Sequence, residues 1–376
     1  MTASPNHAAR SVLIVEQGFL KDRGSAPARG VELFRLNLIR DLAERDIHMS
    51  VVATRSWARL VREMMAVARA ESADRVRIIE VPRLGRAVGG GLAGVWLARR
   101  LMPAGGFDAL IFGNARMGLA PAMLASSILG LARRTLLFAH RKPGARFLDA
   151  VTTVGFRVVA NSRMIADEYR GLTPGGIDVC YGLTGGERYH PGPRQEAAAR
   201  GEDPPDGVVR FCLLARLPNN SKGLEVALAA WDLLPATVRN RCHLHLASWS
   251  SPPDLGRDGV TAHAWIANER VPEFLRGMDA MLCISTYETF SQAMVQGMLT
   301  GLPVIATALP VYVEKIGADG SRGGIVCSGS AEIARAMERV SGDVRMRARL
   351  GSAGREEALA RWVWDADRFI ERHLFV

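Results

Sequence analysis

Short apolar segments alternate with amphipathic segments along nearly the whole chain. The apolar segment SVLIVE at residues 11–16 precedes a helical pattern at 31–45, and a second apolar segment, HMSVVAT, follows at 48–54. The order restarts in the second half, where VVRFCLLAR at 208–216 precedes the helical pattern of GLEVALAAWDLL. This alternation is typical of parallel sheets covered by helices. The sequence therefore predicts an α/β fold.

Further strands are expected in two groups, one in each half of the chain. In the first half, the apolar segments lie at residues 76–81, 108–113, 135–140, 156–161 and 177–182. In the second half, they lie at residues 242–248, 260–266, 279–285, 303–307 and 323–328. The last segment, 360–376, is strongly amphipathic and is predicted to be a helix.

Residues 190–207 separate the two groups of strands. This segment, HPGPRQEAAARGEDPPDG, is rich in proline, glycine and charge and has no apolar periodicity, so it is predicted to be an interdomain linker. A chain of 376 residues also exceeds what one hydrophobic core usually serves. We therefore expect an N-terminal Rossmann-like domain at 1–195, a C-terminal Rossmann-like domain at 208–358 and a terminal helix at 359–376.

The composition, with 48% apolar and 23% charged residues, is that of a soluble globular protein. The N-terminal apolar core, residues 11–15, is too short for a signal peptide, and no long uninterrupted apolar window exists for a membrane span. The five cysteines are scattered, odd in number and without C-x-x-C spacing, which favours a reducing compartment. We expect a cytoplasmic protein.

The formal net charge of +10 is unevenly distributed, and residues 51–103 carry a local excess of six positive charges. Within this stretch, WARLVREMMAVARA at 57–70 has a helical pattern with an apolar face flanked by arginines. The helix either docks on an anionic membrane at the inner face or is an ordinary surface helix packed on its domain. Nucleic acid is not expected as a partner, because no zinc-finger, RNP or helix-turn-helix signature accompanies the charge.

The segment STYETFSQAMVQGMLTGLPVIAT, Ser285 to Thr307, predicts a loop, a helix and a strand. Free backbone N–H groups at the helix start, with its positive dipole end, suit a phosphate; these would belong to Thr289, Phe290 and Ser291. Glu288 lies just before the helix and Gln296 lies eight positions after Glu288. An acidic residue at a helix start is by itself only a favourable dipole partner.

A second segment, LLARLPNNSKGLEVALAAW, places two cations after a predicted strand. Arg216 ends the strand, and Lys222 precedes the next helix. Two cations at the carboxyl edge of a parallel sheet could hold a diphosphate and stabilise the charge that develops on it as a leaving group.

Together these segments resemble glycosyltransferase family 4, whose members have the GT-B fold of two Rossmann-like domains facing across a cleft. In that family an arginine and a lysine at this spacing hold the donor diphosphate, which implies that role for Arg216 and Lys222. The family's first glutamate contacts the donor sugar and corresponds to Glu288. Its second glutamate binds the ribose, and Gln296 occupies that place. An amide still hydrogen-bonds a diol but loses charge assistance worth about 1 kcal/mol.

Two segments of the N-terminal half carry a weaker resemblance. RGVELFRLNLIRDLAERDIHMSVVAT resembles the family's glycine-rich loop and first helix, with Gly30 in place of paired glycines. The preceding loop, 18–30, is expected to approach a phosphate or an acceptor. TLLFAH ends at His140, at a strand tip where α/β sheets place ligand-contacting residues, and resembles the histidine that faces the donor sugar.

The resemblance implies a retaining hexosyltransferase that moves a sugar from a nucleotide-diphosphate donor to a glycan, lipid-linked or small-molecule acceptor. A role in cell-surface glycan, lipopolysaccharide or glycolipid synthesis is expected, with the terminal helix crossing back to the first domain. Two other classes stay open. A nucleotide-sugar epimerase shares the fold, and the glutamine at position 296 is compatible with a non-catalytic binding module.

Two literal motif matches carry no such expectation. GGGLAG at 89–94 has the spacing of a dinucleotide-binding loop but not its context, so it is predicted to be a loop. DAD at 365–367 has the D-x-D spacing that another transferase fold uses for a metal, but it lies in the predicted terminal helix. No cluster with metal-ligand spacing exists elsewhere, so neither a metal nor a cofactor is expected.

Overall fold

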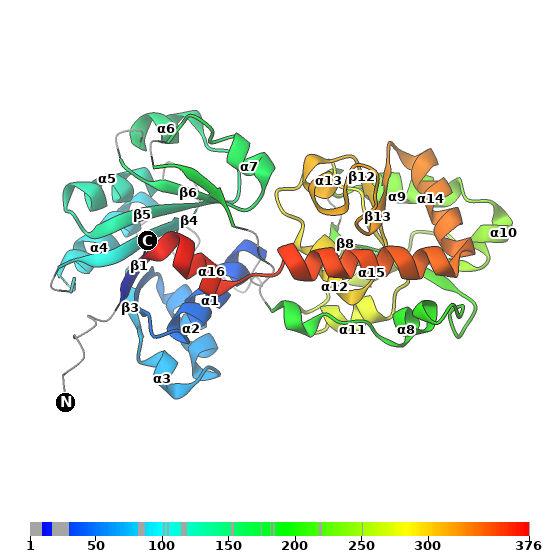
Figure 1. The fold of residues 1–376 in the computed structure, drawn as a ribbon, viewed down its shortest axis with the longest axis horizontal. Helices are drawn as coiled ribbons and strands as arrows, with labels where there is room; N and C mark the ends of the chain where they lie inside the picture. The colour runs from blue at the N-terminus through cyan, green and yellow to red at the C-terminus, as the bar shows by residue number, and fades with distance from the viewer. Residues whose placement is uncertain are drawn as a thin grey trace. The chain divides into compact units, whose positions relative to one another are not determined.

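A computed structural model of the protein describes residues 10–16, 30–81, 87–100, 102–103, 105–113, 119–151, 154–173, 175–180, 182, 185–217, 220–249 and 251–375. The chain forms two compact units, Met1–Thr184 together with Asp365–Val376, and Gly185–Trp364 (Figure 1). Among the described residues, no helix combines the length and the apolar character needed to cross a bilayer.

The first unit is built on a seven-stranded sheet in the order β3-β2-β1-β4-β5-β6-β7. All neighbouring strands in it are parallel. The strands are β1 (Ser11–Glu16), β2 (His48–Ala53), β3 (Val76–Glu80), β4 (Phe107–Gly113), β5 (Ala132–Ala139), β6 (Arg157–Ala160) and β7 (Ile177–Val179). The strand order reverses between β1 and β4, which is where sheets of this kind bind ligands at their carboxyl edge.

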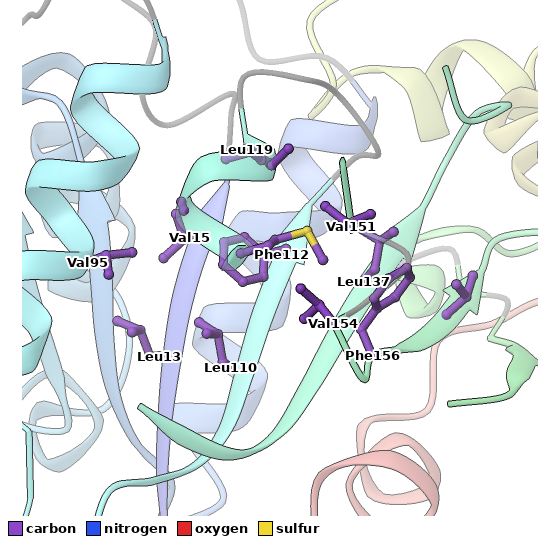
Figure 2. Packing of buried hydrophobic residues seen from close by; sticks show 14 of the residues in the cluster. Leu13, Val15, Val95, Leu110, Phe112, Leu119, Leu137, Val151, Val154 and Phe156 are labelled. Carbon is purple, nitrogen blue, oxygen red and sulfur yellow. The ribbon is translucent and has the colours of Figure 1, made fainter. Parts of the chain in front are cut away.

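Helices cover both faces of this sheet (Figure 1). They are α1 (Gly30–Ala43), α2 (Arg55–Ala66), α3 (Ala70–Ala73), α4 (Ala87–Arg100), α5 (Ala120–Ile128), α6 (Ala145–Val151), α7 (Arg163–Asp167) and α16 (Ala366–Phe369), which continues into a π-helical turn, η5 (Ile370–Leu374). Alternate strand residues such as Leu13, Val15 and Phe112 pack with Val95 of α4 and Val151 of α6 in one buried cluster (Figure 2). The period-two alternation of the strands thus places one set of side chains under α4, α5 and α6.

The segment GGGLAG, predicted to be a loop, lies within the helix α4 instead. A Cβ atom at Gly94 would lie 2.2 Å from Cγ1 of Val52 in β2, so the glycine lets the helix backbone approach the sheet. The prediction was wrong because glycine at a close helix–sheet contact has the same sequence signature as glycine in a loop.

The second unit is built on a six-stranded parallel sheet in the order β10-β9-β8-β11-β12-β13. Its strands are β8 (Val209–Leu217), β9 (Cys242–Trp249), β10 (Val260–Ala264), β11 (Ala280–Cys283), β12 (Val304–Thr307) and β13 (Gly324–Cys327). Its helical elements are η3 (Gly186–Arg188), α8 (Pro193–Ala199), η4 (Asn220–Lys222), α9 (Leu224–Asp232), α10 (Ala236–Arg239), α11 (Val271–Arg276), α12 (Gln292–Thr300), α13 (Pro310–Ile316), α14 (Ser330–Gly342) and α15 (Val344–Arg361). The two parallel α/β units confirm the predicted fold class.

The predicted linker, 190–207, is not a free connection, because it contains helix α8 and packs within the second unit. The side-chain oxygen of Gln195 accepts a hydrogen bond from the backbone N–H of Gly192 at 2.8 Å, which caps the helix start. Arg194 donates to the carboxylate of Asp279, with Nη2 2.6 Å from Oδ2. The proline and glycine of this segment therefore belong to a helix start, and one of its charges belongs to a buried ion pair. Composition alone does not distinguish such a segment from a linker.

The predicted terminal helix is also interrupted. Helix α15 ends at Arg361, and a new helix begins where the carboxylate of Asp365 accepts a hydrogen bond from the backbone N–H of Arg368 at 3.0 Å. The segment from Asp365 onward belongs to the first unit, where the Phe369 ring lies 5.3 Å from the Phe138 ring of β5. Periodicity alone predicted one helix here, but the capping Asp365 starts a second helix within the same amphipathic segment.

The buried ion pair of α8 leads to the first prediction. The Asp279 side chain is 4% exposed, so Arg194→Met would leave its carboxylate buried without its guanidinium partner. We expect the free energy of unfolding to fall by about 3 kcal/mol, measured by urea denaturation. The control, Arg200→Met, removes an arginine whose pairing with Glu202 is exposed, and should change stability little. Equal losses in the two variants would show that α8 is not anchored by this pair.

Candidate functional site

The candidate site of the second unit lies at the carboxyl ends of β8 and β11. These strands are neighbours, and the strand order of the sheet reverses between them. Connections that leave a parallel sheet at such a point diverge to opposite sides and leave room for a ligand. The residues predicted from the motifs lie at the ends of these two strands: Arg216 is the next-to-last residue of β8, Lys222 follows β8, and Glu288 follows β11.

Arg216 occupies an irregular part of β8. The pairing of β8 with β9 shifts register between Leu214 and Leu217, which indicates an extra residue in β8 at this point. Irregularities of this kind turn a side chain away from the regular pleat. The Arg216 side chain is exposed and, among the described residues, forms no ion pair. It is therefore available as a cation at the edge of the sheet.

Lys222 and Glu288 form the central contact of the site. Lys222 ends the short 3-10 turn η4, and its Nζ lies 2.5 Å from Oε1 of Glu288. Each side chain is 22% exposed, so the pair is partly shielded from water. An ammonium and a carboxylate held together in this way present both hydrogen-bond donors and acceptors to the same ligand.

Gly223 makes this contact possible. Its φ is 77°, in the left-handed region, and a Cβ atom there would lie 2.2 Å from the carbonyl oxygen of Ile284. The two connections therefore touch through their backbones. The backbone N–H of Thr286 donates to the carbonyl of Ser221 at 2.9 Å and joins them again. Only glycine allows this approach, which sets the distance between the neighbouring Lys222 and the loop that carries Glu288.

Helix α13 supports the Glu288 loop through Tyr312. The Tyr312 side chain is 1% exposed, and its hydroxyl hydrogen-bonds to the side chains of both Ser285 and Ser291. These serines lie at the two ends of the loop, so one phenol connects them. Burial raises the pKa of Tyr312 well above its ordinary value, so the hydroxyl keeps its proton. Thr307 adds a bond to the loop start, donating to the carbonyl of Ser285 at 3.1 Å.

Lys315, one turn further along α13, is fully buried beneath the same loop. Its Nζ lies 4.5 Å from the ring centroids of both Phe290 and Trp362 and donates to the carbonyl of Val311 at 3.3 Å. Burial lowers the pKa of Lys315 to about 7. The contact with Lys315 thus restrains Phe290, and through the backbone it also restrains its neighbours Thr289 and Ser291.

The helix start differs from the prediction by one residue. Helix α12 begins at Gln292, and Ser291 precedes it in the left-handed region, with φ 60° and ψ 76°. Such a conformation is strained for a non-glycine residue and is held here by the Tyr312 hydroxyl. The N–H groups of the first helical turn therefore lie after Ser291, whereas the phosphate-binding N–H groups were predicted at Thr289, Phe290 and Ser291. Gln296 lies within α12 with a partly exposed side chain.

The remaining predicted residues belong to the first unit. Gly30 is the first residue of α1, and the glycine-rich loop predicted before it, residues 18–29, lies outside the described residues. His140 follows β5 directly, at the carboxyl edge of the sheet. Its Nε2 lies 3.0 Å from Nη2 of Arg35 in α1. Burial and the guanidinium of Arg35 hold the pKa of His140 well below its ordinary value.

The second unit therefore brings Lys222 and Glu288 into direct contact and places Arg216 at the same edge. Sequence reasoning missed the residues that support them, Tyr312 and Lys315. Both lie on the buried side of a short helix. In the sequence, a lysine that will be buried looks the same as a lysine on the surface.

The buried Lys315 leads to the second prediction. Between pH 7 and the ordinary lysine pKa of 10.5, the unfolded chain binds this proton and the folded chain loses it, so the group makes the fold more stable as pH rises. Below pH 7 the lysine is charged in both states, and burial of that charge lowers the free energy of unfolding by its full amount. From pH 7 to 8.5 we expect the free energy of unfolding to rise about 1.5 kcal/mol more in the wild type than in Lys315→Met.

Urea denaturation monitored by tryptophan fluorescence at several pH values measures this difference. Lys142→Met is the control, because it removes an exposed lysine and changes the net charge equally. It should leave the pH dependence of the wild type intact. Parallel pH profiles for wild type and Lys315→Met would contradict the prediction.

Comparison with known proteins extends over both units. Residues 209–343 match the family model of glycosyl transferases group 1. No curated protein matches the chain by sequence. Solved structures match over nearly the whole chain, including sucrose-phosphate synthase from Thermosynechococcus elongatus, with a TM-score of 0.69 and 16% identity over 98% of this chain and 99% of that one.

Two further matches have similar extent. Anabaena HepE, solved in complex with UDP-glucose, has a TM-score of 0.68 and 17% identity over 96% of this chain and 97% of that one. WaaG, a glycosyltransferase involved in lipopolysaccharide biosynthesis, has a TM-score of 0.62 and 14% identity over 97% of this chain and 99% of that one. At these identities the likeness establishes the fold. The chain has the two parallel α/β units of GT-B glycosyltransferases, and its second unit matches the group 1 model.

Proposed function

We propose that this protein is a glycosyltransferase that moves a sugar from a nucleoside-diphosphate donor to a hydroxyl acceptor. The observation that carries the proposal is the contact between Lys222 and Glu288 at the point where the strand order of the second sheet reverses. An ammonium there suits a diphosphate, and a carboxylate beside it suits sugar hydroxyls. The group 1 match over 209–343 covers these residues, and HepE binds UDP-glucose on the same fold.

In the proposed reaction, the charges of the site assist the departure of the diphosphate. The bond between the anomeric carbon and the diphosphate oxygen breaks, and its electron pair leaves with the diphosphate. Lys222, Arg216 and the start of α12 offset the negative charge that grows there. The acceptor oxygen bonds to the anomeric carbon from the same face, and its proton passes to the departing diphosphate oxygen. The product keeps the anomeric configuration of the donor.

Glu288 and Gln296 have different tasks in this proposal. Glu288 accepts hydrogen bonds from the donor sugar, and Lys222 turns from Glu288 toward the diphosphate when the donor is bound. Gln296 contacts the ribose through a neutral amide, which binds less strongly than a carboxylate. The second unit thus holds the donor, and the first unit provides for the acceptor, a glycan, a lipid-linked sugar or a small molecule.

The third prediction tests this assignment. Lys222→Ala should weaken stabilisation of UDP in thermal-shift measurements and lower sugar transfer by about 100-fold, because the charge opposite the leaving group is lost. Gln296→Glu should bind the donor about fivefold more tightly through a charge-assisted bond to the ribose. The control, Arg257→Ala, removes an exposed arginine paired with Asp232 and should leave both measurements unchanged.

A panel of UDP-, GDP- and ADP-sugars identifies the donor, and NMR of the product identifies the linkage. Retained anomeric configuration is expected, and an inverted product would rule out same-face transfer. Turnover of donor without any acceptor would favour the epimerase alternative. Binding of nucleotide without turnover under any acceptor would favour a non-catalytic module.

The basic stretch of the first unit supports peripheral contact with the inner face of an anionic membrane. Helix α2, where the sequence places the amphipathic pattern, buries its apolar face, including Trp57, Val61 and Met65, so it packs on its own unit. Helix α4 instead exposes Trp96 at 53% and carries Arg100, whose guanidinium lies 3.9 Å from the Trp96 ring. An indole beside arginines suits the headgroup region of a bilayer.

The fourth prediction follows from α4. Vesicles containing phosphatidylserine should bind the protein at low salt in a sedimentation assay, and vesicles of phosphatidylcholine should not. Replacing Trp96 with Ser and Arg99 and Arg100 with Gln should weaken binding severalfold. The control is Arg257→Gln in the second unit. If the wild type fails to bind anionic vesicles at low salt, membrane contact through α4 is excluded.

A further inference from the structure

A hydrogen bond joins Arg35 of α1 to His140 at the end of β5. Both side chains are held by aromatic rings. The Arg35 guanidinium, 1% exposed, lies 4.1 Å from the centroid of Phe138, and the His140 ring stacks on Phe138 with an interplanar angle of 11°. Phe34 contacts His140 edge-on at 5.8 Å. The 3.0 Å contact between Nη2 and Nε2 is therefore part of a packed cluster.

The chemistry of arginine determines which way this hydrogen bond runs. A guanidinium carries only donors and keeps its charge at any pH that a protein tolerates. Nε2 of His140 must therefore accept the bond through its lone pair, and it carries no proton. In a neutral imidazole the proton is then on Nδ1. In the part of the chain that the structure describes, no atom accepts a hydrogen bond from that Nδ1–H.

We infer that Arg35 is a positioning residue that holds His140 as the neutral Nδ1–H tautomer, so that His140 donates a hydrogen bond to a sugar hydroxyl and does not act as a proton acceptor. Neither ring nitrogen is then available as a base, since Nε2 is occupied by Arg35 and Nδ1 already carries a proton. The inference rests on the proposed function only for the identity of the bound hydroxyl. The tautomer of the ring follows from the hydrogen bond with Arg35, and burial together with the Arg35 charge keeps the ring neutral.

The titratable groups around the pair do not change its charge in the physiological pH range. Among the described residues, Arg35 is the charged group that acts on His140, and its charge opposes protonation of the ring. Arg35 also acts on Cys180, after β7, but burial raises the pKa of that thiol to about 12, so it stays neutral. Asp178, Asp365 and Arg368 act on Cys180 as charges.

A pH dependence follows from the pair. Burial disfavours the charged ring, and protonated His140 would also have to give up the hydrogen bond from Arg35 and bring two cations into contact, so the pKa of the ring lies well below its ordinary value. The histidine thus stays neutral through the physiological range. Removing the guanidinium should raise the pKa of His140 and release the tautomer.

Long-range ¹H–¹⁵N NMR of the histidine rings in the full-length protein tests the inference directly, with His140→Gln to assign the signal. In the wild type, His140 should show a protonated Nδ1 and an unprotonated Nε2 from pH 5.5 to 8.5. Arg35→Met should shift the tautomer toward Nε2–H and raise the pKa of the ring. Arg35→Lys should retain part of both effects, because an ammonium also donates. Arg40→Met, which removes a partly exposed arginine from the same helix, should behave as the wild type.

Transfer assays give the second measurement. Arg35→Met should lose several-fold more transfer at pH 8 than at pH 6 relative to wild type, because the Nε2–H tautomer has no proton on Nδ1 whereas the protonated ring does, and Arg35→Lys should recover part of it. An Nε2–H tautomer in the wild type, or an Arg35→Met ring with unchanged tautomer and pKa, would overturn the inference even if transfer is observed. The expected NMR signature without transfer of any sugar would leave the ring assignment intact and count against the proposed function instead.

Discussion

The backbone contact between Gly223 and the carbonyl of Ile284 is the constraint on which the site of the second unit depends. Two connections that leave neighbouring parallel strands normally diverge, and side chains keep them apart. At Gly223 a Cβ atom would lie 2.2 Å from that carbonyl oxygen, so the absence of a side chain is what lets them meet. The contact between Lys222 and Glu288 follows from this approach, because each residue lies close to the point where the backbones touch.

Helix α13 determines whether the Glu288 loop keeps its shape. The Tyr312 hydroxyl joins both ends of the loop, and the Lys315 ammonium lies against Phe290 at its centre. Burying a charge for this purpose costs stability, and the lowered pKa of Lys315 is the measure of that cost. A preorganised loop does not need to reorganise when a ligand arrives, which is how rigid sites stabilise developing charge.

The first unit also depends on a buried basic side chain. Arg35 hydrogen-bonds a histidine and lies over an aromatic ring. A guanidinium in that place excludes a second positive charge, so the histidine beside it becomes a neutral donor. Among the described residues, each unit thus contains a buried basic side chain, Arg35 or Lys315, that acts on a neighbouring side chain or loop at the carboxyl edge of its sheet.

The sequence by itself determined the strands, their parallel arrangement and the motif residues, because apolar periodicity and motif spacing are properties of neighbouring residues. The prediction of Glu288, Lys222 and Arg216 as site residues rests on this spacing. Only the tertiary structure decided the roles of residues whose surroundings come from distant segments. GGGLAG lies in a helix, where Gly94 contacts Val52. Residues 190–207 pack on the second unit through the ion pair between Arg194 and Asp279, and Arg35 and Lys315 are buried. Burial and close approach depend on which segments meet in space, and the local pattern of a sequence does not contain that information.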